Sequence, residues 1–340
     1  MAYVANFPFA TIEPNIGVVP VPDIRLQQLS EVVKESDGLD HLPPEVPATV
    51  EFVDIAGLIA GAHKGEGLGN KFLHNIRETD AILHVVRGFT DENIIREGSV
   101  NPAADFGVIE TELMMADYET LEKQKEVRGA APREENTRWQ AVLKLKDAVT
   151  KGIPARRVEF TDEELVHVKQ LSLLTMKPIL IAFNIDEEAL KDYGELEKKY
   201  AEMFGVGAGQ VIAVCARTEA DLAGLSEEDQ LEYMKGIGVE RSGLDRVIKK
   251  AFATLDLITF LTAGEKEVRA WTIKKGIDAK TAAGVIHSDF EKNFIKADVC
   301  EYEDFIKYGW KKAREEGKVR IEGKDYIVKD GDVVEFKIGT

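Results

Sequence analysis

The segment formed by residues 50–73 constrains the fold more than any other part of the sequence. It opens with a β-branched and aromatic run that ends at Asp54, and Gly57 follows three residues later. In phosphate-handling α/β folds an Asp at the carboxyl end of a strand holds Mg²⁺, and a glycine lets a backbone N–H approach a phosphate because no Cβ intervenes. Further glycines between Gly57 and residue 73 are typical of a switch segment. A bare Asp-x-x-Gly is more often a turn than a metal site, but a long glycine-rich extension after an apolar strand is much rarer. The pattern therefore predicts an α/β fold with Asp54 as a candidate metal ligand and Gly57 as a candidate phosphate contact.

Short apolar segments that alternate with helical patterns predict the same fold class. The candidate strands, which we expect to be parallel, are residues 17–21, 50–54, 81–87, 178–184 and 210–215. Ligand sites in such sheets lie beyond the carboxyl ends of the strands, so the polar residues that follow these strands are candidate site residues.

Between residue 101 and about residue 169 the apolar spacing becomes helical, with charged residues on the other faces. This predicts a helical hairpin inserted between two strands and joined near residues 129–132. Thr161 and Glu164 fit a capping box that opens the return helix. The insert is compatible both with a solvated helical pair without chemistry and with an arm that binds a partner.

The C-terminal part has a strand pattern of its own. Candidate strands are residues 268–273, 296–302, 324–328 and 333–338, and residues 329–332 form a good hairpin turn. These features predict a small mixed β-grasp fold.

Composition narrows the cellular setting. The chain has 340 residues and only two cysteines, Cys215 and Cys300, which suggest no disulfide framework and fit a reducing cytoplasm. Its longest apolar runs, such as residues 179–183, are too short to span a bilayer, and no secretory signal is evident. We expect a cytoplasmic protein without a membrane partner.

The net charge of −17 is unevenly distributed. From residue 256 onward there are 16 Lys and Arg against 17 Asp and Glu, whereas residues 1–255 hold 28 against 44. The acidic excess argues against a general nucleic-acid coat, no DNA specificity is evident, and RNA contacts are expected in the C-terminal part. Basic residues cluster there within 18 positions, at Lys307, Lys311, Lys312, Arg314, Lys318, Arg320 and Lys324. With Tyr308 and Trp310 nearby, this cluster is either an RNA-contacting surface or a solvated face.

Several separated motifs, in order along the chain, resemble the YchF / Obg-like ATPase family of the Obg branch of translation-factor GTPases. The segment of residues 50–73 resembles the family's switch II. The family's switch I resembles Asn6-Phe-Pro-Phe-Ala-Thr-Ile-Glu-Pro-Asn15, and its altered base-recognition motif resembles Asn184-Ile-Asp-Glu187. Its C-terminal TGS domain resembles Phe260-Leu-Thr-Ala-Gly264, Glu267-Val-Arg-Ala-Trp-Thr272 and Ile286-His-Ser-Asp-Phe-Glu291. The resemblance covers nearly the whole chain.

The resemblance implies a Ras-like, mostly parallel sheet with an inserted helical hairpin and a C-terminal β-grasp domain of the TGS type. The implied boundaries are residues 1–100 and 170–255 for the OBG-type nucleotide-binding domain, 101–169 for the insertion and 256–340 for the TGS domain. The implied partners are ATP with Mg²⁺ and the ribosome or ribosomal RNA.

The same resemblance assigns site residues. Thr11 and Asp54 would coordinate Mg²⁺, and Asn184, Ile185 and Glu187 would shape a base pocket that prefers ATP to GTP. Asp186 lies inside that motif and leaves residual guanine binding open. Cys215 and Ala216 match the last nucleotide loop, which contacts the base by backbone, although a lone cysteine is more often a buried small apolar group.

No catalytic residue is assigned. Leu58 follows Gly57 where a Ras-like enzyme has its water-orienting Gln, and a Leu cannot hydrogen-bond a water. His63 is a possible substitute or simply a loop residue. The family resemblance implies that an apolar residue is normal at position 58.

The 340 residues contain no Gly-x-x-x-x-Gly-Lys-Ser/Thr, the loop that holds β- and γ-phosphates. In the family this loop lies before switch I, so the sequence is expected to lack the first strand, the P-loop and most of the first helix. A truncated gene model is favoured over an evolved P-loop-free protein. Two functions stay open: an ATPase whose nucleotide state is coupled to ribosome or RNA binding, and a non-hydrolysing ribosome- or RNA-binding module.

Overall fold

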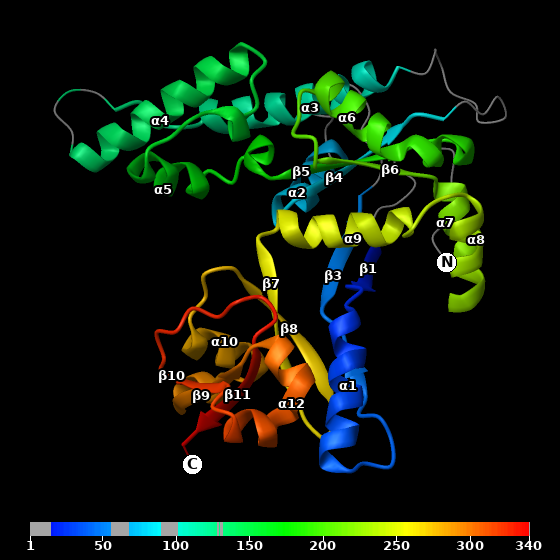
Figure 1. Ribbon diagram of the computed structural model, residues 1–340. Coiled ribbons are helices and arrows are strands. Elements are labelled where there is room, and N and C mark those ends of the chain that lie inside the picture. Colours follow the sequence, from blue (N-terminus) through cyan, green and yellow to red (C-terminus); the bar gives the residue numbers. More distant parts are fainter. Residues whose placement is uncertain (1–14, 56–67, 90–100, 128, 130–131, 340) are drawn as a thin grey trace. The chain divides into compact units, whose positions relative to one another are not determined.

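The computed structural model describes residues 15–55, 68–89, 101–127, 129 and 132–339 (Figure 1). Its contacts divide the chain into two compact units. Within the described ranges, unit 1 holds residues 15–17 and 53–247, and unit 2 holds residues 18–52 and 248–339. Unit 2 is therefore built from two stretches that are far apart in the sequence.

The strands are β1 (Asn15–Pro20), β2 (Glu45–Val46), β3 (Thr49–Asp54), β4 (Ile82–Arg87), β5 (Ile179–Asn184), β6 (Val211–Val214), β7 (Leu257–Ala263), β8 (Val268–Lys274), β9 (Phe294–Cys300), β10 (Val319–Glu322) and β11 (Val333–Ile338). The α-helices are α1 (Ile24–Asp37), α2 (Leu68–Glu78), α3 (Pro102–Glu122), α4 (Arg133–Thr150), α5 (Asp162–Gln170), α6 (Tyr193–Phe204), α7 (Ala216–Leu222), α8 (Glu227–Gly236), α9 (Gly243–Thr254), α10 (Ala279–Ile286), α11 (Ser288–Lys292) and α12 (Tyr302–Glu315). Among these described helices, none has the length and apolar character that crossing a bilayer requires.

The sheet of unit 1 is parallel, with strand order β4-β5-β6 among the described strands. Its central strand β5 reads Ile-Leu-Ile-Ala-Phe-Asn, and its first five residues are fully buried, as expected for a strand covered on both faces. The predicted α/β class and the predicted strands at residues 81–87, 178–184 and 210–215 are confirmed.

The two earlier strands behave differently from the prediction. β1 and β3 pair with each other in a separate two-stranded sheet. The N–H of Val21 donates to the carbonyl of Ala48 at 2.7 Å. Val21 directly follows β1, and Ala48 directly precedes β3. With these two residues opposite each other, the strands lie side by side only if they run in opposite directions, so the pair is antiparallel. The expected parallel arrangement is wrong here because an apolar run identifies a strand but not its partner.

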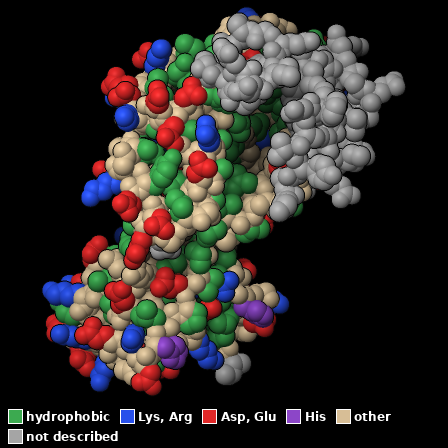
Figure 2. Space-filling view, turned by 90° about the vertical axis from the view of Figure 1, so that its right-hand side faces the viewer, with side chains coloured by type: hydrophobic (Ala, Val, Ile, Leu, Met, Phe, Trp, Pro, Cys, Tyr) green, Lys and Arg blue, Asp and Glu red, His purple; other side chains and the backbone are tan. Residues whose placement is uncertain are grey.

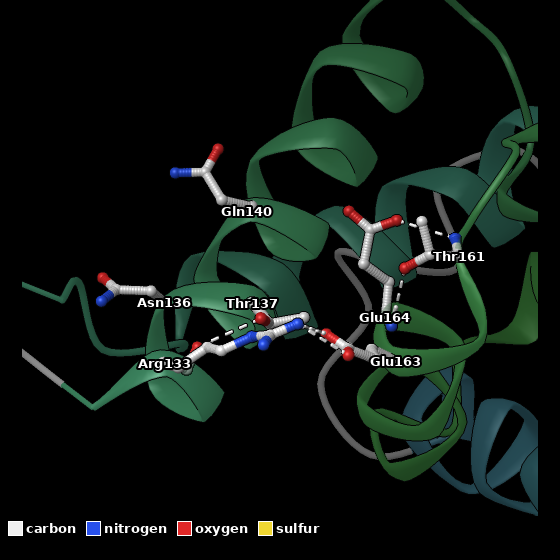
Figure 3. Close-up of a pocket in the computed structure, with 7 residues that line it drawn as sticks. All are labelled: Arg133, Asn136, Thr137, Gln140, Thr161, Glu163 and Glu164. Atoms are coloured by element: carbon white, nitrogen blue, oxygen red, sulfur yellow. Dashed lines mark hydrogen bonds and ion pairs between the residues drawn. The ribbon is translucent and has the colours of Figure 1, made fainter.

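The helical insert of unit 1 forms as predicted, with α3 and α4 followed by α5. Thr161 and Glu164 form the capping box: the Thr161 hydroxyl accepts the Glu164 N–H at 3.3 Å, and a Glu164 carboxylate oxygen accepts the Thr161 N–H at 2.9 Å (Figure 3). The buried carboxylate of Asp117 on α3 accepts the N–H groups of Leu174 and Thr175 at 2.7 and 2.8 Å. These bonds fasten α3 to the short helical turn that leads into β5.

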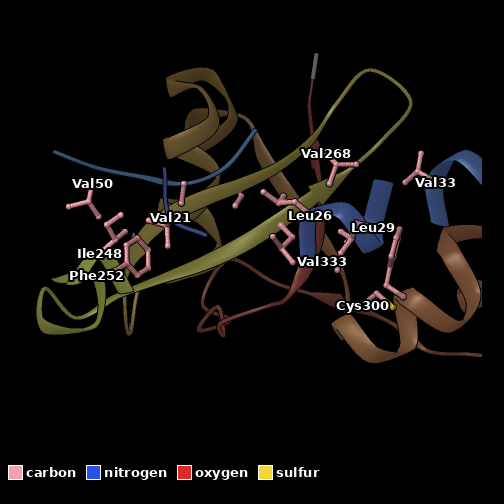
Figure 4. Packing of buried hydrophobic residues seen from close by; sticks show 14 of the residues in the cluster. Val21, Leu26, Leu29, Val33, Val50, Ile248, Phe252, Val268, Cys300 and Val333 are labelled. Atoms are coloured by element: carbon pink, nitrogen blue, oxygen red, sulfur yellow. The ribbon is translucent and has the colours of Figure 1, made fainter. Parts of the chain in front are cut away.

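Unit 2 contains a mixed six-stranded sheet with the order β10-β9-β11-β7-β8-β2. β2 pairs parallel with β8, and β11 pairs parallel with β7, whereas the other neighbours are antiparallel. α1 packs on this sheet, and Figure 4 shows its Leu26, Leu29 and Val33 among the buried side chains of the cluster. The mixed sheet agrees with the predicted β-grasp pattern, and the assignment to the TGS type stays a prediction.

This C-terminal sheet differs from the sequence prediction in three details. Residues 324–328 do not form a strand, and only Ile327 makes an isolated bridge, to Asp278. The predicted turn exists, because the Asp332 N–H donates to the Lys329 carbonyl at 3.2 Å with Gly331 at φ 83°, but it does not join two paired strands. β7 and β10, which the sequence did not predict, complete the sheet.

The composition of unit 2 differs from the predicted C-terminal domain. Residues 18–52 were assigned to the nucleotide-binding domain, whereas their contacts group them with residues 248–339. The Val268 N–H donates to the Pro44 carbonyl at 2.9 Å, and Arg25 bonds to Asp330 at 3.0 Å. The predicted boundaries of the nucleotide-binding, helical and TGS domains themselves stay predictions.

Candidate nucleotide-base site

The carboxyl ends of β5 and β6 bring the two predicted base loops together. The strands are parallel neighbours, and Asn184 at the end of β5 is in register with Val214 at the end of β6. The loop that begins with Ile185 and the loop formed by Cys215 and Ala216 therefore leave the same edge of the sheet, where ligand sites of such sheets lie.

Asn184 connects these loops. Its side-chain oxygen accepts the N–H of Ala216 at 3.0 Å, and its carbonyl accepts the N–H of Gly88 at 2.7 Å. A Cβ on Gly88 would overlap the ring of Phe183, so only glycine allows this close approach after β4. The remaining side-chain group of Asn184 is an NH₂, which can donate to a ligand.

The side chains of Ile185 and Cys215 are directed into the core. Ile185 is 4% exposed and Cys215 is 5% exposed, and both belong to the apolar cluster of unit 1. The predicted part of Ile185 in shaping a base pocket stays a prediction, and with its side chain buried a bound base would meet its main chain. The burial of Cys215 agrees with the reading of a small apolar group, and its backbone role stays a prediction.

Glu187 is held by two hydroxyl groups. Its Oε2 accepts the hydroxyl of Thr218 on α7 and the hydroxyl of Tyr233 on α8, each at 2.8 Å. The hydrogen bond from Thr218, followed by that from Tyr233, holds the pKa of Glu187 below its ordinary value. The carboxylate is thus a charged acceptor at neutral pH.

The predicted metal and phosphate residues are only partly covered by the structure. Asp54 is exposed at the end of β3, and Thr11 and Gly57 lie outside the described residues. A carboxylate oxygen at a strand end suits Mg²⁺, which prefers oxygen ligands and keeps several waters. In the described ranges no three His, Cys, Asp or Glu residues gather as a metal cluster.

Several bracing residues of this site were not identified from the sequence. Thr218 lies two residues after the predicted loop and was within reach of sequence reasoning. Tyr233 comes from 46 residues beyond Glu187, and Arg246 from 49 residues beyond its ion-pair partner Glu197, so only the fold reveals them. Glu197 also accepts the N–H of Ala213 on β6 at 2.9 Å. This bonding fixes the strand that leads into the second base loop.

A hollow lies elsewhere in unit 1, on the helical insert. It has a volume of about 560 Å³ and is open to solvent; it is lined by polar side chains from the starts of α4 and α5, namely Arg133, Asn136, Thr137, Gln140, Thr161, Glu163 and Glu164 (Figure 3). Arg133 and Glu163 pair across it at 2.8 Å. None of the predicted nucleotide residues lines it.

Two family models match the sequence. Residues 1–113 match a family described as "50S ribosome-binding GTPase", and residues 257–339 match the C-terminal domain of YchF GTPases, described as "Protein of unknown function (DUF933)".

Similar proteins match over almost the full chain. The Ribosome-binding ATPase YchF of Bacillus subtilis (strain 168) is 47% identical, over 99% of this chain and 92% of the relative. The protein of the same name from Escherichia coli O157:H7 is 48% identical, over 98% and 91%. A solved structure of the Schizosaccharomyces pombe YchF GTPase has a TM-score of 0.82 and 36% identity, over 98% of this chain and 90% of that chain. The predicted loss of a P-loop segment stays a prediction. The extent and identity of these matches show that the chain belongs to the YchF family.

Proposed function

We propose that the chain is a ribosome-associated protein of the cytoplasm that binds ATP in preference to GTP. The support comes from the curated relatives, which are named ribosome-binding ATPases, and from the base site of unit 1. The observation that carries the proposal is the bond from Ala216 to Asn184, because it joins both base loops at one sheet edge and leaves the Asn184 NH₂ as a donor.

The residue types at this edge favour adenine. In a guanine-specific Asn-Lys-x-Asp motif a lysine stacks over the base, whereas here Ile185 takes that position with its side chain buried. Adenine has no 2-amino group and presents an N6 amine, which a backbone carbonyl can accept. Thr11 and Asp54 would hold Mg²⁺, which neutralises phosphate charge when it is bound.

The sequence motif that binds nucleotide phosphates is the part of the proposed site that these 340 residues do not supply. They contain no loop of the type that surrounds β- and γ-phosphates with backbone N–H groups and a lysine. We therefore expect weak Mg-ATP binding and negligible turnover from these 340 residues. The same observation favours a second candidate, a ribosome- or RNA-binding module that does not hydrolyse ATP.

A lysine group on α12 is our candidate for the ribosome contact. Figure 2 shows that basic side chains are interspersed with carboxylates on unit 2, the lower part of the view. In the described part of the chain Lys307, Lys311 and Lys312 have no carboxylate within ion-pair distance, whereas Arg314, Lys318 and Arg320 pair with acidic residues of the unit. Among the described residues Lys324 of the cluster likewise has no ion pair but lies beyond α12, so we call the three unpaired residues on the helix the α12 lysines.

The aromatic residues of this cluster differ in what they can offer RNA. Tyr308 is half-buried and has the ammonium groups of Lys307 and Lys312 at 4.9 and 5.6 Å from its ring centre. Trp310 is anchored instead, because its Nε1 donates to the Ala263 carbonyl at 3.0 Å and its ring packs edge-on against Phe305. Tyr308 with the α12 lysines is therefore the part of the cluster that fits a phosphate backbone.

Two measurements test the proposal. Competition of ATP and GTP against a fluorescent ATP analogue, extended to millimolar nucleotide, should rank ATP first, and a GTP preference would contradict the base-site assignment. Ribosome co-sedimentation through a sucrose cushion at low salt should carry the chain into the pellet. Co-sedimentation that does not change with Mg-ATP, together with absent nucleotide binding, would favour the non-hydrolysing module.

A further inference from the structure

The contacts of Glu187 bear on how this site distinguishes bases. Glu187 occupies the position at which a guanine-specific motif has its recognition carboxylate. That carboxylate accepts the N1–H and the 2-amino group of guanine together, which requires one free acceptor position on each of its two oxygens.

The acceptor positions of Glu187 are unequally available. A carboxylate oxygen has two lone-pair positions. Both positions on Oε2 are used, because the hydroxyls of Thr218 and Tyr233 each donate to this one atom at 2.8 Å. Each hydroxyl has a single proton, so neither can donate to Glu187 and to a ligand at the same time.

The two donors come from well-fixed positions. Thr218 is 1% exposed on α7, and Tyr233 is half-buried on α8. The N–H of Asp229 donates to Ser226 at the start of α8, and Gln230 donates to the carbonyls of Leu222 and Leu225, which fastens α8 to the end of α7. The hydroxyl pair is therefore part of the folded unit and not a chance contact of two mobile side chains.

We propose that Thr218 and Tyr233 are specificity-determining residues, which exclude guanine by saturating Oε2 of Glu187. Guanine can then reach Oε1 only, and one of its two N–H donors is left without an acceptor. Adenine presents no such pair of donors, so the saturation of Oε2 removes none of its hydrogen bonds. This inference rests on the proposed adenine preference and adds the residues that produce it.

The test removes the hydroxyls while the shape is kept. T218V, Y233F and the double variant are titrated with ATP and GTP to millimolar concentration, and the ratio of the two dissociation constants is compared with that of the unaltered chain. A hydrogen bond to a charged acceptor corresponds to about tenfold or more in affinity, so the ATP preference of the double variant should fall by about that factor. Y233F alone should give a smaller change in the same direction, and it keeps the test valid if the buried T218V substitution impairs folding.

Two further variants separate specificity from loosened structure. S226A removes a hydroxyl that caps α8 without touching Glu187, and it should leave the ratio unchanged. Adding E187Q to the double variant replaces one acceptor oxygen by a donor, so the gained GTP binding should disappear. A gain that survives E187Q would overturn the proposal, as would a double variant that folds and keeps the original ratio.

The outcome also separates this inference from the function on which it rests. If the unaltered chain prefers GTP or binds neither nucleotide, the proposed base site is wrong. If it prefers ATP and the double variant does so equally, the base site stands and the role of Thr218 and Tyr233 is rejected.

Discussion

The side-chain oxygen of Asn184 accepts the backbone N–H of Ala216 at 3.0 Å, 32 residues further along the chain. The carbonyl of the same residue accepts the N–H of Gly88, which follows β4. One residue thus connects segments that follow three neighbouring strands, and its remaining NH₂ group is directed by that connection. This relationship allows the structural and the ligand-binding roles of Asn184 to be tested separately.

The substitutions N184A and N184D should have different effects. N184A removes the acceptor for Ala216 and should lower the free energy of unfolding by about 1–2 kcal/mol. N184D keeps an acceptor oxygen but loses the NH₂ donor, so it should restore most of the stability and still bind ATP several-fold more weakly. Urea unfolding and ATP titration provide the two measurements. Unchanged ATP binding in N184D would show that the NH₂ group does not contact the base.

Charge reversal of the α12 lysines should weaken ribosome binding in a salt-dependent way. Lys307, Lys311 and Lys312 changed together to Glu should reduce co-sedimentation at low salt, because the uncompensated charge near Tyr308 is lost. The matched control changes Lys274, Lys275 and Lys280 of the same unit, which gives an equal change in net charge at exposed positions. An equal loss in both variants would indicate a general charge effect, and no loss in either would make the α12 lysines a solvated face.

The stability of the chain should depend on His84 below pH 6.5. Burial lowers the pKa of His84 from 6.5 to about 4, and its Nδ1 has no hydrogen-bond partner beside the stacked ring of Phe106. The unfolded state takes up this proton at higher pH than the folded state. The stabilisation that comes from the neutral His84 side chain is therefore fully present above pH 6.5 and is lost as the pH falls toward 4.

H84L should remove that pH dependence. Relative to H84L, the unaltered chain should lose up to about 3 kcal/mol of unfolding free energy between these two pH values. Urea unfolding at several pH values measures the difference. H74Q serves as the control because the His74 side chain is 66% exposed. Parallel curves for H84L and the unaltered chain would show that His84 titrates normally in the folded state.

Gly309 should not tolerate a side chain. It interrupts α12 with φ 62° and ψ 177°, and a Cβ at this position would lie 3.1 Å from the Cβ of Ser36 on α1. G309A should therefore destabilise unit 2 by about 1–3 kcal/mol. G323A is a suitable control, since Gly323 has open space around it. Thermal unfolding monitored by tryptophan fluorescence in a W139F background, which leaves Trp271 and Trp310, reports on this unit. Equal midpoints for the two variants would contradict the prediction.

Local signals predicted local structure well. The apolar run of β5, the capping box of Thr161 and the turn at Gly331 depend on residues that are close in sequence, and each occurs where predicted. The strand expected at residues 324–328 does not form, because whether an apolar run joins a sheet depends on a partner that the run itself does not specify.

In the candidate site, too, the sequence predicted local features but not the contacts between distant segments. The motif at Asn184 predicted two candidate base loops, and the register of β5 and β6 brings these loops together. The motif could not show that the Ile185 side chain is buried or that Tyr233 reaches Glu187, because both depend on how distant helices pack. The inclusion of residues 18–52 in unit 2 likewise depends on contacts over more than 200 residues, such as that of Arg25 with Thr259.

The bond between Arg25 and Asp330 spans 305 residues, and this has a consequence for the order in which the chain can fold during synthesis. Leu26 and Leu29 of α1 are made long before Val333, which shares their apolar cluster. The apolar cluster around α1 therefore stays incomplete until Val333 has been made. Unit 1 can form in the meantime from residues between 53 and 247, and its folding shortens the loop that must close before the two ends of unit 2 meet.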